Sequence, residues 1–111
     1  MKLVKVEKIG KKKEYEAIFE KDGKQFKRQF GTPNNYVGEG NKTKKDRENY
    51  RKRHGTNPLE QKALKDPTTP ASLSMELLWG ESKSIKINIT LYKKKYFLYL
   101  LYNGIFWLST E

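Results

Sequence analysis

The chain has 111 residues, enough for one small domain with a modest core. Its 24 Lys and Arg against 13 Asp and Glu give a formal charge of +11, which predicts an anionic partner: nucleic acid, an anionic membrane face or an acidic protein surface. The chain contains no cysteine, which excludes disulfides and thiolate metal sites and favours an intracellular setting.

Residues 1–31 are predicted to form an antiparallel β-hairpin or three-stranded meander. The dipeptide Asp22-Gly23 indicates a tight two-residue turn, because both turn positions require a positive φ. The register that follows pairs Tyr15 with Phe30, Ala17 with Arg28 and Phe19 with Phe26. We expect the opposite face to be solvated; it carries Glu16, Ile18, Lys27 and Gln29.

Residues 32–42 are predicted to be a flexible loop, because they are rich in Gly and Asn and hold few apolar side chains. A basic helix is expected from Thr43 to Arg53, with Thr43 as its cap and Asp46 completing a capping box. Tyr50 is its only large apolar residue, so the pattern predicts either a solvated arm or a helix held by a partner.

A short helical piece is predicted over Pro58 to Lys65, followed by a core helix. Thr69 and Pro70 mark the start of this core helix and Gly80 its end. We expect it to meet the aromatic face of the hairpin, so that Leu73, Leu77, Leu78 and Trp79 pack on Tyr15, Phe19, Phe26 and Phe30.

Residues 84–96 fit two patterns. Ile85, Ile87 and Ile89 alternate as in a strand, while Ile85, Ile89 and Tyr92 recur at helical spacing. The β-branched content favours a strand slightly, whereas the lysine run 93–95 fits a helix end.

The tail, residues 97–111, carries a second hairpin signal at Asn103-Gly104, and both faces of that hairpin would be apolar. We therefore expect an apolar interface made by Phe97, Leu98, Leu100, Leu101, Phe106 and Trp107. The fold class predicted for the whole chain is α+β, with an N-terminal hairpin or meander (1–31), a loop (32–42), short helices (43–96) and a C-terminal strand or hairpin (97–111).

No catalytic, cofactor-binding or metal-binding residues are predicted, and we do not expect an enzyme. The only histidine is His54, which has no second imidazole or cysteine with which to share a metal. Its place at the end of the basic helix favours a role in stabilising the helix dipole. The carboxylates are scattered and balance nearby lysines and arginines.

Basic clusters are the strongest functional signal. The predicted contacts to an anionic partner are Lys44, Lys45, Arg47, Arg51, Lys52, Arg53, Lys93, Lys94 and Lys95.

The middle of the chain resembles a family of small basic proteins of uncharacterised function from giant nucleocytoplasmic large DNA viruses. The likeness covers roughly residues 12–96 and rests on the order of these pieces: Gln29-Phe30-Gly31, the run 46–54 (DRENYRKRH), the run 66–73 (DPTTPASL), Leu77-Leu78-Trp79-Gly80 and Tyr92-Lys93-Lys94-Lys95-Tyr96. The resemblance implies a viral accessory or virion component, and a helix after Gly80. It does not extend to residues 97–111.

Two functions are compatible with these observations. The first is a non-enzymatic virion protein, a minor capsid or capsid-associated component that bridges larger subunits. The alternative is a sequence-independent DNA-binding or packaging protein. The expected location is the virion, and the interior of the infected host cell. Contact of the tail with a membrane is compatible with its composition, but the tail is too short to span a bilayer.

Overall fold

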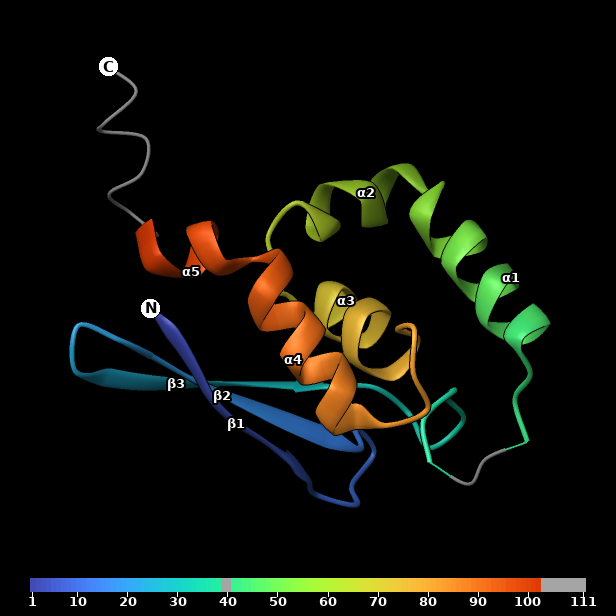
Figure 1. The fold of residues 1–111 in the computed structure, drawn as a ribbon, viewed down its shortest axis with the longest axis horizontal. Coiled ribbons are helices and arrows are strands. Elements are labelled where there is room, and N and C mark those ends of the chain that lie inside the picture. Colours follow the sequence, from blue (N-terminus) through green and yellow to red (C-terminus); the bar gives the residue numbers. More distant parts are fainter. Residues whose placement is uncertain (39–40, 103–111) are drawn as a thin grey trace.

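The computed structural model describes residues 1–38 and 41–102, and its fold is α+β, as predicted (Figure 1). An antiparallel sheet comes first, with its strands in the order β1-β2-β3, and short helices follow. The strands are β1 (Lys2–Lys8), β2 (Tyr15–Lys21) and β3 (Lys24–Phe30). The helices are α1 (Lys44–Gly55), α2 (Pro58–Leu64), α3 (Pro70–Leu73), the π-helix η1 (Ser74–Leu78), α4 (Ile85–Lys95) and α5 (Phe97–Tyr102).

The β2–β3 hairpin has the predicted register. Asp22 and Gly23 both adopt positive φ, at 52° and 78°, which suits the tight turn. Three pairs confirm the register: Tyr15 with Phe30, Ala17 with Arg28 and Phe19 with Phe26. Two of these pairs stack their rings, at centroid distances of 5.8 and 5.2 Å. The prediction of a solvated opposite face is wrong for Ile18, which is only 6% exposed.

The loop after β3 is part of the core, so the prediction of a flexible loop is wrong for residues 35–37. The side chain of Asn35 accepts a hydrogen bond from the Val37 amide (3.1 Å) and donates one to the Thr32 carbonyl (2.7 Å). This local turn directs Tyr36 inward, where its amide donates to the Leu78 carbonyl at 3.1 Å. The sequence did not predict the burial of residues 35–37, because Asn-rich segments are also typical of solvated turns.

The core helix consists of α3 followed directly by η1. Thr69 caps it and Pro70 is its first residue, as predicted. Its buried leucines, at positions 73, 77 and 78, join Phe19 and Phe30 in one apolar cluster, which confirms the predicted meeting of helix and hairpin. The packing is tight at Gly31, where a Cβ would overlap the side chain of Leu78.

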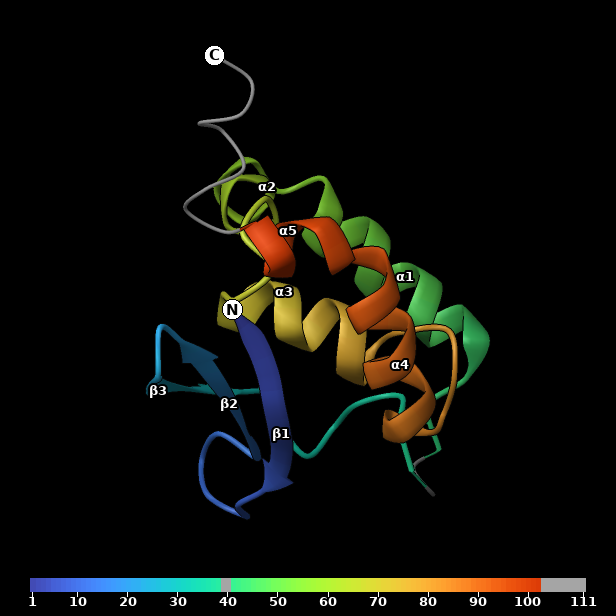
Figure 2. The same ribbon diagram turned by 60° about the vertical axis from the view of Figure 1, so that its left-hand side comes forward.

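The elements form three layers. Figures 1 and 2 both show α3 lying between the sheet and an outer layer made by α1 and α2. Helix α4 packs against η1 and closes the core from the side. The core helix therefore lies between the outer layer and the sheet.

Residues 85–95 form helix α4, which corrects the slight preference for a strand and agrees with the helix implied by the family resemblance. The side chain of Ser84 caps the helix and accepts from the Ile87 amide. Helical spacing puts Asn88 and Tyr92 on the buried side, where each finds a hydrogen-bond partner. A strand would instead have aligned the isoleucines on one face.

Residues 97–102 form helix α5, so the predicted C-terminal strand or hairpin is wrong over this range. Leu100 is 7% exposed and belongs to the core, which removes it from the predicted apolar interface. The hairpin signal at Asn103-Gly104, and with it Phe106 and Trp107, lies outside the described residues.

Candidate functional site

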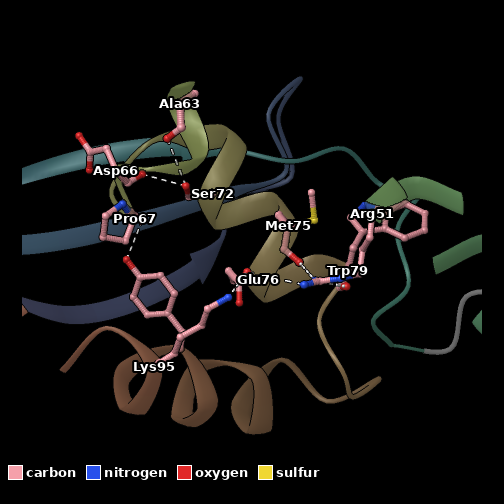
Figure 3. A network of polar contacts seen from close by, with 10 residues as sticks. Arg51, Ala63, Asp66, Pro67, Ser72, Met75, Glu76, Trp79 and Lys95 are labelled. Atoms are coloured by element: carbon pink, nitrogen blue, oxygen red, sulfur yellow. Dashed lines mark hydrogen bonds and ion pairs between the residues drawn. The ribbon is translucent and has the colours of Figure 1, made fainter. Parts of the chain in front are cut away.

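Helix α1 is attached to the core helix by two arginines. Figure 3 shows Arg51 directed at the end of η1, where its Nη1 donates to the carbonyls of Met75 (2.9 Å) and Trp79 (3.0 Å). The Nε of Arg47 donates to the Gly80 carbonyl at 2.6 Å. Carbonyls at a helix end lack partners within the helix, and the two guanidinium groups supply them. Both arginines were predicted to face an anionic partner, but the structure places them in intramolecular bonds.

Aromatic stacking strengthens this attachment. The ring of Tyr50 lies parallel to Trp79, with centroids 4.2 Å apart and 5° between the planes, and His54 covers it at 4.1 Å. Burial raises the pKa of Tyr50. His54 Nδ1 also contacts the carboxylate of Glu60 at 2.5 Å, which ties α1 to α2. His54 therefore lies in the last turn of α1, as predicted, and also contacts Glu60 on the next helix.

Glu76 joins three helices. Its carboxylate lies 3.8 Å from Nη2 of Arg51 on α1 and 3.0 Å from Nζ of Lys95 on α4 (Figure 3). Burial alone would lower the pKa of Lys95, but the hydrogen bond and charge of Glu76 outweigh it and raise that pKa. Lys95, which was predicted to contact an anionic partner, therefore pairs with a carboxylate of the same chain.

A cleft of about 290 Å³ lies between α1 and α4. Four cations line it (Arg47, Arg51, Lys94 and Lys95), together with Glu76, Glu81, Gly80, Asn88 and Leu91. Two basic clusters that are far apart in sequence therefore meet here, which the sequence did not predict. Because two carboxylates share the cleft, much of its positive charge is balanced inside the molecule.

The remaining predicted cations face solvent. Lys44, Lys45, Lys52, Arg53, Lys93 and Lys94 are exposed and form no ion pair with residues 1–38 or 41–102. Arg53 lies over the ring of Tyr50 at 5.9 Å. These exposed groups, more than the two capping arginines, are the ones available to an anionic partner.

Helix α5 carries the α5 apolar face, which we define as Phe97, Leu98, Leu101 and Tyr102. These side chains are 41–59% exposed. Their spacing of one, four and five residues places them on one side of the helix, opposite the buried Leu100. Phe97, Leu98 and Leu101 were predicted as interface residues, and the structure leaves all three accessible.

A second cleft, also of about 290 Å³, borders this face. It lies between the start of β1 and α5, and its lining combines two lysines with apolar side chains: Met1, Lys2, Leu3, Lys93, Phe97, Leu100 and Leu101. An apolar slot with cations at its rim suits a partner that is both apolar and anionic.

In comparisons with known proteins, no family model, no curated protein and no solved structure matches the chain. Over the described ranges, no helix is long and apolar enough to cross a bilayer. In the same part of the chain, no cluster of three or more histidine, aspartate or glutamate side chains is placed to hold a metal ion. The fold and the surface thus define a small basic α+β protein with an exposed apolar helix.

Proposed function

We propose that this chain is a non-enzymatic structural protein of a large DNA virus particle, a minor capsid or capsid-associated component that bridges larger subunits. The observation that carries the proposal is the α5 apolar face: four large apolar side chains, 41–59% exposed, on one side of a helix whose other side is in the core. Apolar side chains grouped in this way mark interaction surfaces. The resemblance to small basic proteins of giant viruses supports the viral setting.

Charge around α5 supports the same role. Residues 85–102 contain four lysines and no Asp or Glu. A partner with an acidic surface would be attracted to this segment, and the apolar face would then be covered. In this proposal the particle supplies the surface that covers α5.

Leu98→Asp is expected to abolish incorporation of the protein into particles. The substitution places a charge in the centre of the α5 apolar face, and it should leave the fold intact because Leu98 is largely exposed. The measurement is the protein composition of purified particles by mass spectrometry.

The matched control is Leu59→Asp on α2, because Leu59 is an apolar residue that is 86% exposed and lies outside the face. Incorporation of the Leu98 variant at the level of this control would contradict the proposal. A deletion of residues 97–111 would be less informative, since it also removes the buried Leu100.

A second candidate function is sequence-independent DNA packaging. The observation that favours it is the set of exposed cations on α1, of which Lys44, Lys45 and Lys52 form no ion pair with the described part of the chain. Phosphate neutralisation requires cations of this kind.

If DNA is the ligand, Lys44→Gln/Lys45→Gln should flatten the plot of log affinity against log salt, by roughly 0.9 for each phosphate that the protein no longer neutralises. The control is Lys21→Gln/Lys24→Gln, which removes the same charge at the hairpin turn. Absence of binding to duplex DNA at about 50 mM salt would exclude this function.

A further inference from the structure

We propose that the α5 apolar face docks on an anionic lipid surface, with the lysines beside it contacting the phosphate headgroups. The inference rests on the proposed function, because it names the surface of the particle that covers α5. It makes the protein a peripheral membrane-binding component whose helix lies in the interface.

The helix itself is apolar or aromatic throughout. Residues 97–102 read FLYLLY, so every side chain is apolar or a tyrosine. Phe97, Leu98 and Leu101 present their apolar surface to solvent, and Tyr102 adds an amphipathic ring of the kind found at headgroup level. A helix with this surface can bury its apolar side at the boundary between headgroups and acyl chains.

The cations beside the face come from two elements. Lys93 on α4 and Lys2 on β1 line the cleft that Phe97 and Leu101 also line. The ion pair of Lys2 with Glu20 is long, at 3.7 Å, and 71% of the Lys2 side chain is exposed. Positions 85–102 contain no acidic residue, and Lys93 forms no ion pair with the part of the chain that the structure describes.

The kind of cation distinguishes a lipid surface from a protein surface. Protein–protein interfaces are enriched in arginine and depleted in lysine. Here the cations next to α5 are lysines, whereas Arg47 and Arg51 are engaged with main-chain carbonyls beneath α1. Lysine acts as a mobile point charge, which suits headgroups that have no fixed geometry. Figure 1 shows α5 on the side of the molecule away from α1.

The test is co-sedimentation of the full chain with vesicles. We expect binding to phosphatidylcholine vesicles that contain roughly 30% phosphatidylserine, and no binding to phosphatidylcholine alone. Leu98→Asn and Leu101→Asn should each weaken the partition coefficient by roughly tenfold, since each removes a large apolar group without changing the charge. Leu59→Asn should have no effect, and circular dichroism should show that all three variants remain folded.

The lysines are tested by the neutral pair Lys2→Gln/Lys93→Gln, the two that line the cleft beside α5, which should weaken binding by about 25-fold, or fivefold for each lysine. The same charge loss in Lys44→Gln/Lys45→Gln should have a much smaller effect, because α1 lies away from α5. An equal effect of the two pairs would overturn the proposal, since attraction would then depend only on total charge.

A failure of this inference can be told apart from a failure of the proposed function. If anionic vesicles do not bind the protein while Leu98→Asp is still lost from particles, the surface that covers α5 is an acidic protein and the lipid inference is wrong. If vesicles bind but the Leu98 variant enters particles normally, the proposed structural function is wrong instead.

Discussion

Replacing Arg51 by alanine is expected to lower the free energy of unfolding by about 2–3 kcal/mol, because hydrogen bonds from charged groups contribute about 1.5–3 kcal/mol. One guanidinium group serves the carbonyls of both Met75 and Trp79 and also faces Glu76. Without it, two carbonyls at the end of the core helix are left without their partner. The change in stability is measured by denaturant unfolding, and the near-ultraviolet circular dichroism of the Tyr50–Trp79 stack should weaken in parallel if α1 detaches.

Lys52→Ala is the matched control, because this exposed neighbour on α1 also carries a positive charge. Its effect should stay within about 0.5 kcal/mol. The stability of the Arg51→Lys variant should lie between those of Arg51→Ala and Lys52→Ala, since an ammonium group cannot reproduce the geometry of a guanidinium that donates to two carbonyls. Equal stabilities of the Arg51→Ala and Lys52→Ala variants would refute the capping role of Arg51.

Replacing Asn88 by alanine is expected to cost about 2–4 kcal/mol of stability, because it leaves buried polar groups without partners. The Asn88 side chain is 1% exposed and holds the turn before α4 in place. Its Oδ1 accepts from the Ser82 amide (3.0 Å), and its Nδ2 donates to the carbonyls of Ser82 (2.8 Å) and Leu77 (3.0 Å). The cavity left behind adds to the destabilisation.

Thr90→Ala provides the comparison on the same helix. The Thr90 hydroxyl donates only to the Lys86 carbonyl, on the exposed side of α4. We expect a change within about 0.5 kcal/mol. Thermal and denaturant unfolding of both variants would measure the difference, and an Asn88→Ala variant as stable as Thr90→Ala would show that the Ser82 turn holds without this side chain.

Local signals predicted the β2–β3 hairpin and the helix caps. The Asp22-Gly23 turn determines the register of its strands by geometry alone, so no distant contact was needed. The same holds for Thr43 and Thr69, whose caps involve only the first turn of their helices. Residues 84–96 satisfied both the strand period and the helix period. The helix buries Asn88 and Tyr92 in hydrogen bonds to distant carbonyls, and such contacts are visible only in the folded molecule.

The candidate site was harder to predict, since it depends on contacts between distant residues. Arg51 bonds to carbonyls 24 and 28 residues away, and Arg47 to one 33 residues away. A count of positive charges cannot separate these arginines from the exposed lysines beside them. Leu100 illustrates the same limit, because nothing in the run FLYLLY tells which leucine faces the core.

The attachment of α1 through main-chain carbonyls has a consequence for how this protein can diverge. Every amino acid carries a carbonyl, so Arg47 and Arg51 impose no side-chain identity on the residues that accept their hydrogen bonds. Distant relatives could retain the docking of helix α1 while their α1 sequences share little beyond the motif Arg-x-x-Tyr-Arg at positions 47, 50 and 51. A search weighted toward that short motif, together with an aromatic residue at position 79, should find relatives that overall identity would miss.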